Sequence, residues 1–546
     1  MELFPFWIWQ WYHLHRKEKE IPTMKKLLVF GFVLLVLVAS PLVATGDKEA
    51  KPQTPATSIS MNPTGFPIVN EPVQFRVFGV RDQNQADWKN VKMLSDYRVR
   101  SNVDMIYQEV PTQGFDEKKS LLFASNDLPD LFIRSMLNPV EIAKYGMESG
   151  QLIPLNDLIE KYAPNFMAII EKHPHIRSAI TSADGNIYAL PELDLSNTGR
   201  MGFKQWINKE WLKKLDLEPP KTTDELVTVL RAFRDKDPNG NGLKDEIPLG
   251  IREASSIYVL GGAFGLQYQM KETVNIEDGK VHFWLKDDRF KTYLQFLNQL
   301  YREDLLWKDY YKRDLPSWRS NLSNARFGAF YMPYSDVFLN VEDQFIGYIP
   351  LVGPYGDQLW SDANSGILQI GAFAISNIAT NPEVAVRWVD YFYSEEGSLY
   401  WRYGIEGDTY YRNEQGNPVF KDSILKDPRG FMTALGEINL VPGGAFPHLI
   451  TNDTDGVVAS ALTKEVSAMM VPFLPKNVYL QPNFTQDESE EYVTIVQDLH
   501  KYRDEAVTKF ILGEWSFNRW DEYCSTLDKI GLPRLEQLYQ QAFNRL

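Results

Sequence analysis

The stretch from Asp237 to Glu246 holds the residues best suited to chemistry, because oxygen-bearing side chains alternate there around two glycines. Hard cations such as calcium bind oxygen ligands at this spacing. Counted from Asp237, side-chain oxygens recur at positions three, five, nine and ten, a glycine at six permits a sharp turn, and position seven offers a backbone carbonyl. The predicted calcium ligands are the side chains of Asp237, Asn239, Asn241, Asp245 and Glu246 and the carbonyl of Leu243.

The pattern is similar to an EF-hand loop except at its end. An EF-hand loop closes with a glutamate at position twelve. This chain has Pro248 there, so Glu246 at position ten would have to supply the closing carboxylate. The alternative is a solvated turn, since asparagine and glycine favour turns without any metal. Two amides and three carboxylates in this register favour calcium over the bare turn.

The elements on either side of this loop are predicted to be a helix and a strand. Thr222 to Glu225 has the sequence of a capping box, and apolar residues follow it at helical spacing as far as Phe233. Residues 247–249 leave the loop in an extended form. Calcium would therefore fix a helix end to a strand, which is a stabilising role at a distance from any chemistry.

Strands and helices alternate along the first part of the chain. Residues 73–78, 103–107 and 130–133 read as strands, a helix is predicted over 115–124, and 185–191 reads as a strand closed by Pro191. Such alternation indicates a parallel α/β sheet.

A second series follows the first. It includes a helix over 209–215, a small-residue strand over 371–375, a helix containing Val384 to Phe392, and helices over 515–530 and 535–543. A chain of 546 residues exceeds the roughly 300 residues at which a single core stops growing, so at least two packed units are expected.

Composition restricts the class of partner. The hydrophobic share of 44% and charged share of 24% are ordinary for a soluble globular protein, and the formal net charge of −15 disfavours nucleic acid and anionic membranes. Neutral ligands are favoured without acidic ones being excluded. The one cysteine, Cys524, permits neither a disulfide framework nor a thiolate metal site.

The N-terminal segment 1–46 has the features of an export signal. Two lysines after Met24 precede an apolar run, and small residues at 44–46 allow cleavage. Residues 1–23 read as an extension upstream of the true start, and 47–70 as a flexible spacer. An uncleaved membrane anchor is the alternative. Asp47 stands where a lipoprotein signal would need a cysteine, so we expect an extracellular or cell-surface protein without a lipid anchor.

Six segments together resemble extracellular solute-binding proteins of the carbohydrate class that serve ATP-driven importers. The likeness is greatest to the long subgroup with the alginate-binding proteins and the lipoproteins of sugar-utilising bacilli. The matching segments span nearly the whole mature chain in the family's order: Ser125 to Leu131, Asp184 to Pro191, Trp211 to Leu217, the loop 237–246, Tyr403 to Gly407, and Trp520 to Tyr523.

This resemblance implies an α/β, two-lobed periplasmic-binding-protein-like fold of type II, with lobes joined by hinge crossovers and solute held in the cleft. It places the same six calcium ligands in the second lobe. It also implies a carbohydrate ligand, the membrane permease subunits of an ABC importer as partners, no nucleic acid and a monomer. The expected division is lobe 1 at 71–192 and 366–430, and lobe 2 at 193–365 and 431–546.

Aromatic residues are the expected sugar contacts, because flat rings match the apolar faces of sugars while polar groups pair with hydroxyls. The chain has 14 Trp and 27 Tyr, and many of these rings, such as Trp211, Trp388 and Trp520, fit the core instead. The predicted ligand contacts lie in polar or glycine-rich segments: Trp360, Asp362, Tyr400, Trp401, Tyr331 and Tyr334.

Two other functions are compatible with parts of the sequence. A secreted calcium-stabilised glycoside hydrolase needs two carboxylates at a suitable separation, and the 72 Asp and Glu residues offer many pairs. A calcium-stabilised adhesion module is disfavoured, since such modules are usually repeated units. The chain lacks a Gly-x-Ser-x-Gly elbow, a His-Glu-x-x-His helix and a Walker loop. We therefore predict a binding protein and no enzyme.

Overall fold

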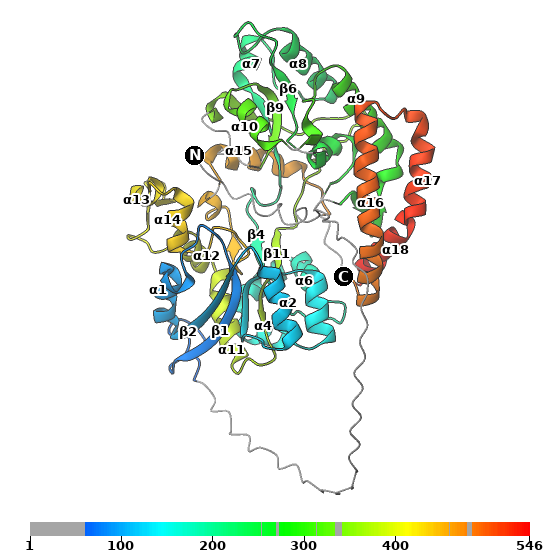
Figure 1. The fold of residues 1–546 in the computed structure, drawn as a ribbon. Helices are drawn as coiled ribbons and strands as arrows, with labels where there is room; N and C mark the ends of the chain where they lie inside the picture. The colour runs from blue at the N-terminus through cyan, green and yellow to red at the C-terminus, as the bar shows by residue number, and fades with distance from the viewer. Residues whose placement is uncertain are drawn as a thin grey trace, which may run out of the picture. The chain divides into compact units, whose positions relative to one another are not determined.

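Two separate β-sheets organise the chain (Figure 1). In the first sheet every neighbouring pair is parallel, except that β11 runs antiparallel to β3 and β4. Its strands, in spatial order, are β14 (Leu449–Ile450), β4 (Leu190–Asp194), β11 (Ile367–Ile375), β3 (Leu131–Leu137), β1 (Val73–Arg81) and β2 (Val103–Pro111). Because β1, β2, β3 and β4 point the same way, their carboxyl ends meet at one edge of the sheet.

The second sheet is smaller and mixed. β5 runs antiparallel to both of its neighbours, whereas β6 and β9 are parallel. Its spatial order is β10 (Phe345–Gly347), β5 (Lys204–Asn208), β9 (Phe327–Met332) and β6 (Ile247–Gly250). Two hairpins complete the strands: β7 (Val274–Glu277) with β8 (Lys280–Phe283), and β12 (Tyr410–Arg412) with β13 (Pro418–Phe420).

The structure is a computed structural model, and it describes residues 60–252, 254–268, 272–312, 314–333, 341–457, 459–477 and 483–545. The described residues from Met61 onward belong to one compact unit. The predicted export signal lies outside the described residues. Within the described ranges, no helix combines the length and apolar character needed to span a membrane.

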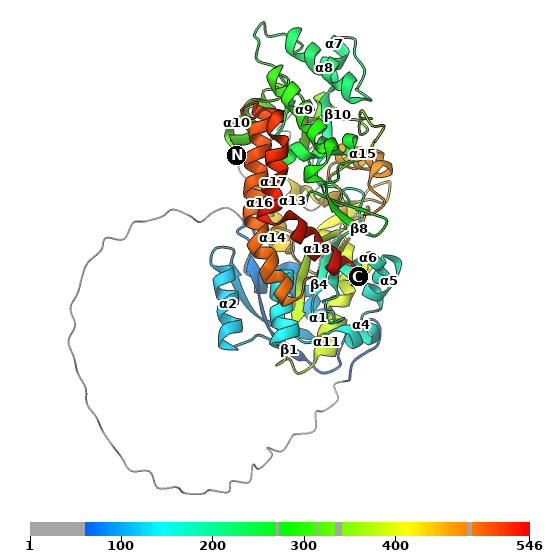
Figure 2. The same cartoon turned by 90° about the vertical axis from the view of Figure 1, so that its right-hand side faces the viewer.

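Helices connect and flank the strands. The last three, α16, α17 and α18, lie side by side in two views (Figures 1 and 2), and α16 also contacts α9. The α-helices are α1 (Lys92–Ser101), α2 (Phe115–Ser125), α3 (Pro139–Ile142), α4 (Asn156–Tyr162), α5 (Pro164–Lys172), α6 (Pro174–Ile180), α7 (Lys209–Lys214), α8 (Thr223–Asp235), α9 (Asp288–Arg302), α10 (Leu315–Ser323), α11 (Pro382–Asp390), α12 (Glu395–Tyr403), α13 (Asp422–Leu425), α14 (Phe431–Ile438), α15 (Ala461–Met470), α16 (Gln486–Leu512), α17 (Trp520–Ile530) and α18 (Leu532–Phe543).

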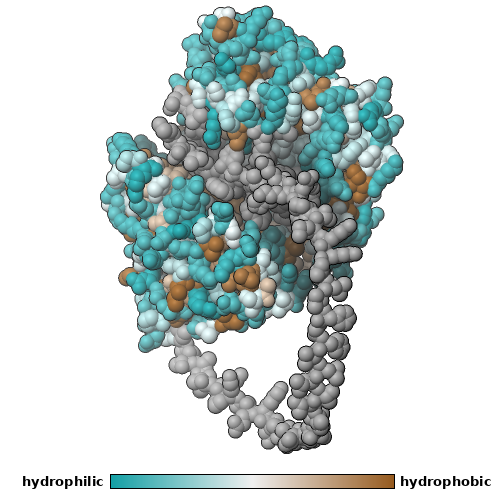
Figure 3. Space-filling view, viewed as in Figure 1, coloured by the Kyte–Doolittle hydropathy of each residue, from teal (hydrophilic) through white to brown (hydrophobic). Residues whose placement is uncertain are grey.

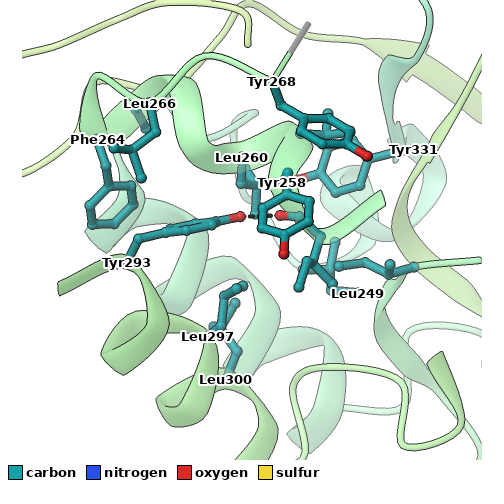
Figure 4. Close-up of a cluster of buried hydrophobic side chains, with 14 of the residues drawn as sticks. Leu249, Tyr258, Leu260, Phe264, Leu266, Tyr268, Tyr293, Leu297, Leu300 and Tyr331 are labelled. Carbon is teal, nitrogen blue, oxygen red and sulfur yellow. Dashed lines mark hydrogen bonds between the residues drawn. The ribbon is translucent and has the colours of Figure 1, made fainter. Parts of the chain in front are cut away.

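Each sheet has its own hydrophobic core. Phe78, Phe132 and Ala374 belong to a cluster around the first sheet. Trp206 and Phe330 belong to a larger cluster around the second, which also takes in the C-terminal helices. Part of the second core appears in Figure 4, where several tyrosine rings pack with leucines. Outside these cores, Figure 3 shows a mainly hydrophilic face with small, separate hydrophobic groups. Each of these two clusters therefore surrounds one sheet within the compact unit.

Most predicted elements appear in the structure. The predicted N-cap is present, since the Thr222 hydroxyl accepts a hydrogen bond from the Glu225 N–H at 3.1 Å. The Glu225 carboxylate reaches the N–H of Lys221 instead of the cap residue. The strand predicted at 185–191 is displaced, because β4 begins at Leu190 and contains Pro191. Shifts in the register with β11 accommodate this proline, which has no N–H to donate.

The predicted flexible spacer 47–70 extends too far toward the C-terminus. Ile68 and Val69 are completely buried, and the Phe66 ring lies edge-on to Tyr97 with centroids 5.6 Å apart. Met61 also forms a bridge with Val69. These apolar side chains attach residues 61–70 to the folded body, so any spacer must end before them.

The predicted boundary at residue 431, where the chain returns to the second lobe, lies too early in the chain. Met432 and Leu435 of α14 pack with Tyr403 and Phe420, and the two-residue strand β14 joins the first sheet beside β4. A strand of two residues has no periodic pattern, so this pairing cannot be predicted from the sequence. Residues 431–457 therefore pack with the first sheet.

Candidate functional site

Two chain segments cross between the sheets side by side. Residues 195–203 lead from β4 to β5, and residues 360–366 lead into β11. Met201 forms an antiparallel bridge with Ala363. The N–H of Asn364 donates to the Arg200 carbonyl at 2.8 Å. These contacts join the two crossings into one connection, as expected for hinge crossovers.

A third segment, residues 451–457, contacts the first crossing. The Asn197 N–H donates to the Asn452 side-chain oxygen at 2.7 Å, and the Thr198 hydroxyl donates to the Asp455 carboxylate at 3.0 Å. Soon afterwards the chain enters α15, which contacts β10 of the second sheet. In the part of the chain that the structure describes, three segments therefore pass between the two sheets.

Lys204 lies at the centre of these crossings and is 1% exposed. Its ammonium donates to the carbonyls of Thr198, Met201 and Gly202 at 3.0, 3.2 and 3.3 Å. Burial lowers the pKa of Lys204 to about 8, although the Asp362 carboxylate and other nearby acids act in the opposite direction. A single buried cation thus holds the backbone of the first crossing.

Asp362, predicted as a sugar contact, braces the same crossing. Its Oδ2 accepts a hydrogen bond from the Phe203 N–H at 2.6 Å. A Cβ at Gly202 would lie 2.4 Å from that oxygen, so only glycine allows the close approach. Burial raises the pKa of Asp362 to about 6, against the opposing effects of the Phe203 hydrogen bond and the Lys204 charge. The structure therefore gives Asp362 a place in the hinge, which its sequence context did not reveal.

Trp360 and Tyr331 are also interior residues. The Trp360 indole donates to the Phe203 carbonyl at 3.1 Å. Trp360 and Tyr331 are each 1% exposed. Tyr331 lies within the core drawn in Figure 4. Both side chains pack in the core around the second sheet. The prediction placed them in accessible loops instead. Tyr334 lies outside the described residues.

Tyr400 and Trp401 belong to α12 and not to a loop. The Tyr400 hydroxyl donates to the Asp96 carboxylate at 2.6 Å. The Trp401 ring stacks on Phe446 with centroids 3.5 Å apart, and the tryptophan is 1% exposed. The predicted contacts therefore fill the core of the first sheet. The burial of Tyr400 and Trp401 could not be predicted, because Gly404 after α12 is a residue typical of loops.

The carboxyl edge of the first sheet holds a cluster of buried charges for which the sequence has no recognisable motif. Glu192 of β4 and Arg134 of β3 are both almost completely buried, and His448 and Arg402 lie beside them. Ligands in open α/β sheets bind outside the carboxyl ends of the strands. An acidic residue within the apolar run of β4 was the available signal, since charges are rarely buried without a partner or a role.

These buried charges hold the loop 440–446. Arg134 donates to the carbonyls of Leu440 and Pro442 at 2.9 and 3.2 Å. Glu192 Oε2 accepts from the Ala445 N–H at 2.7 Å. Burial raises the pKa of Glu192 to about 7, and it lowers that of His448 to about 3. At neutral pH His448 is therefore uncharged.

The predicted calcium loop is folded around its own side chains. Asp237 accepts from the N–H groups of Gly240 and Gly242 at 2.9 and 3.2 Å. The Asn241 side-chain oxygen accepts from the Leu243 N–H at 2.7 Å. The glycines have φ of 75° and 76°, the left-handed values that their positions in the turn require. Leu243 itself is exposed.

Asp245 and Glu246 show how the loop's charges are balanced. The amide groups of Asn239 and Asn241 donate to Asp245 Oδ1 at 2.9 and 3.0 Å. Glu246 Oε1 is buried with no hydrogen-bond partner among the described residues. Burial raises the pKa of Glu246, and the Asp237 and Asp245 charges raise it further. An oxygen cluster with this excess of negative charge suits a hard cation.

The described residues contain no group of three or more His, Cys, Asp or Glu side chains disposed to hold a metal. In the loop, the amide nitrogens face Asp245, so the carboxylates do not form a set of their own. The loop brings the predicted residues together without the arrangement of a complete ion shell.

Comparison with known proteins establishes the family. The pattern of the bacterial extracellular solute-binding proteins matches residues 100–398, which is more than half of the chain. The chain belongs to this family. Members of the family bind solutes, so the prediction of a binding protein in place of an enzyme is confirmed.

Several similar proteins span nearly the whole folded body. The fructooligosaccharide ABC transporter substrate-binding protein FusA of Streptococcus pneumoniae is 28% identical over 79% of this chain and 82% of its own. The polygalacturonan/rhamnogalacturonan-binding protein YtcQ of Bacillus subtilis is 23% identical over 83% of this chain and 88% of its own.

Solved structures of similar proteins confirm the periplasmic-binding-protein-like fold. The structure of FusA in complex with kestose has a TM-score of 0.67 at 25% identity, covering 86% of this chain and 99% of that one. An extracellular solute-binding protein from Bifidobacterium longum subsp. infantis has a TM-score of 0.75 at 22% identity, covering 87% and 98%.

Replacing Lys204 should weaken the connection between the lobes. Lys204→Met leaves three backbone carbonyls and the buried Asp362 without their cation, so we expect a loss of roughly 3–5 kcal/mol in the free energy of unfolding. Urea titration followed by fluorescence measures it. Lys213→Met removes an exposed lysine as the control, and we expect a change within about 0.5 kcal/mol. Equal losses in the two variants would contradict the role of Lys204.

Stability should also depend on pH through Asp362. Its pKa rises from 3.8 in the unfolded chain to about 6 in the folded protein, so the folded state binds more protons between these values. The contribution of Asp362 to stability is therefore full below pH 3.8 and is lost as the pH rises to about 6. In urea titrations of the wild type and Asp362→Asn, we expect their difference to change across this window and stay constant above it. A constant difference from pH 4 to 7 would show that Asp362 does not titrate in this way.

Proposed function

We propose that the protein captures an oligosaccharide outside the cytoplasmic membrane and delivers it intact to the permease subunits of an ABC importer. The observation that carries this proposal is the likeness to FusA, which extends over most of both chains. The paired crossings support it as well, because segments that join two separately packed sheets at one place can act as a hinge.

The solute is best placed at the carboxyl edge of the first sheet, facing the crossings. This edge is where parallel α/β sheets bind ligands. The buried charges there keep the edge rigid, and polar groups held by a rigid scaffold bind sugar hydroxyls at a low cost in entropy. The protein's negative net charge favours a neutral sugar over a polyanion.

Binding without turnover distinguishes this proposal from the glycoside hydrolase. Kestose, nystose and a neutral galactose-based oligosaccharide should each be titrated calorimetrically into the purified protein. We expect at least one of these sugars to bind in a 1:1 complex and to raise the melting temperature of the protein by mass action. Chromatography of the same samples after a day should show unchanged sugar. Released monosaccharide would instead support the hydrolase, and a lack of binding to all three would contradict the proposed ligand class.

We further propose that the loop 237–246 binds one calcium ion with a structural role. Asp237, Asn239, Asn241, Asp245 and Glu246 would supply side-chain oxygens, and Leu243 its carbonyl. The buried Glu246 Oε1, which has no hydrogen-bond partner among the described residues, supports this role, because a cation would offset the burial and the Asp237 and Asp245 charges that raise the pKa of Glu246. Two of the similar solved structures are of the alginate-binding protein AlgQ2 without calcium ion and of an EF-hand mutant of FusA.

Calcium removal should lower the melting temperature by several degrees. An ion that binds only the folded state stabilises it by mass action, so a chelator should have the same effect as the double variant Asp237→Ala/Asp245→Ala. Differential scanning calorimetry with calcium and with chelator measures both. Asp422→Ala, at an exposed acid in α13, is the control and should keep the calcium response. A calcium response that persists in the double variant would contradict the site.

The proposal for the N-terminus is export by the segment 1–46 and a monomeric mature protein. Mass spectrometry of the secreted protein's first residue tests the cleavage. A start near Asp47 fits the signal, whereas retention of residues 24–46 fits the anchor.

A further inference from the structure

Three consecutive residues at the carboxyl edge of the first sheet have left-handed backbone conformations. Gly443, Gly444 and Ala445 have φ of 83°, 59° and 62°. For alanine this region is disfavoured, and such strain persists only where the surroundings over-determine the backbone. Strained turns of this kind cluster at ligand contacts.

Buried polar side chains hold this turn from both sides. Glu192 accepts from the Ala445 N–H at 2.7 Å, and Arg134 donates to the Leu440 and Pro442 carbonyls just before the turn. Gln85 donates to the same two carbonyls at 3.2 and 2.6 Å. Burying a carboxylate and a guanidinium carries a large desolvation cost. Stability alone therefore does not explain why the chain uses charges at this turn.

The middle of the turn is accessible although its supports are buried. Gly443 and Gly444 are partly exposed, while Ala445 and Phe446 are buried. A Cβ at Gly443 would lie 2.7 Å from the Arg134 guanidinium and 2.8 Å from Asp82. A Cβ at Gly444 would meet the Glu192 carboxylate only at ordinary contact distances of 3.5 and 3.8 Å. Glycines at such positions let a ligand approach the backbone closely.

We infer that the turn 443–445 contacts the solute through its backbone, and that Glu192 and Arg134 are positioning residues that fix its left-handed conformation. The inference rests on the proposed function and adds to it a residue-level contact in the first lobe. The N–H groups of Gly444 and Ala445 already donate to the Val441 carbonyl and to Glu192, so the turn would present its carbonyls to sugar hydroxyls, which can donate to them. Glu192 and Arg134 act through the turn and need not touch the solute.

Gly444→Ala tests the contact. The added methyl group fits beside Glu192 but stands where the solute would approach, so we expect about tenfold weaker binding of the oligosaccharide that the wild type binds. Gly150→Ala is the matched control. Gly150 has φ of 62° and open space around it, and its carbonyl accepts from the Asn377 side chain just beyond β11, at the opposite edge of the sheet. Both variants should lose similar stability, and only Gly444→Ala should lose affinity.

Glu192→Gln and Glu192→Ala test the positioning role. Glutamine keeps an oxygen that can accept from Ala445, so we expect affinity within about threefold of the wild type, whereas alanine should weaken binding about tenfold. Rescue by the conservative variant distinguishes support of the turn from a need for the charge. Equal affinities for the alanine and wild-type proteins would overturn the role of Glu192.

Hydrogen exchange on the wild type gives a result that does not depend on any variant folding. Saturation with the bound oligosaccharide should slow exchange at the 443–445 amides at least severalfold, and exchange near Gly150 should stay unchanged. Unslowed exchange at the turn, or wild-type affinity in folded Gly444→Ala, would overturn the inference alone. A wild type that binds none of the oligosaccharides would overturn the proposed function together with it.

Discussion

One buried ammonium group connects the two halves of this protein. Lys204 donates to three carbonyls of the segment that joins β4 to β5. The Asp362 carboxylate, in the neighbouring crossing, attracts the Lys204 ammonium and accepts a hydrogen bond from the Phe203 N–H. Neither group would be stable in the interior by itself, because desolvation of an unpaired charge is expensive. Together they fix the crossings relative to each other while each sheet keeps its own core. A connection that is rigid at its centre and narrow in extent allows two packed bodies to rotate about it.

The same use of buried charge recurs at the proposed solute edge. Glu192 and Arg134 hold a strained glycine turn as Lys204 holds the crossing, in both cases through backbone groups. The loop 237–246 differs, because its Asp237 and Asp245 carboxylates accept hydrogen bonds from groups within the loop itself. We therefore assign stability to the loop, movement to the crossings, and recognition to the edge of the first sheet.

Periodic segments could be predicted from the sequence, and non-local contacts could not. The strands and helices with regular apolar spacing, such as β1, α2 and α8, appear nearly where expected. The two-residue strand β14 and the proline-containing β4 depend on partners far along the chain, so their sequences alone did not define them. The proposed calcium loop could be predicted because its candidate ligands are close in sequence. The buried positions of Trp360 and Trp401 were not, because loop-like neighbours say little about which rings a fold encloses. Glu192 acts through a residue more than 200 positions away, and no local pattern indicates such a contact.

As proposed, the protein holds an intact oligosaccharide between two bodies joined by a hinge. This capture can be observed by native mass spectrometry of the mature protein with an equimolar mixture of neutral oligosaccharides. We predict a single adduct whose mass equals protein plus one unaltered sugar, accompanied by a lower mean charge state that reports a more compact molecule. Protein without any adduct, or sugar recovered in cleaved form, would show that the chain is not such a binding protein.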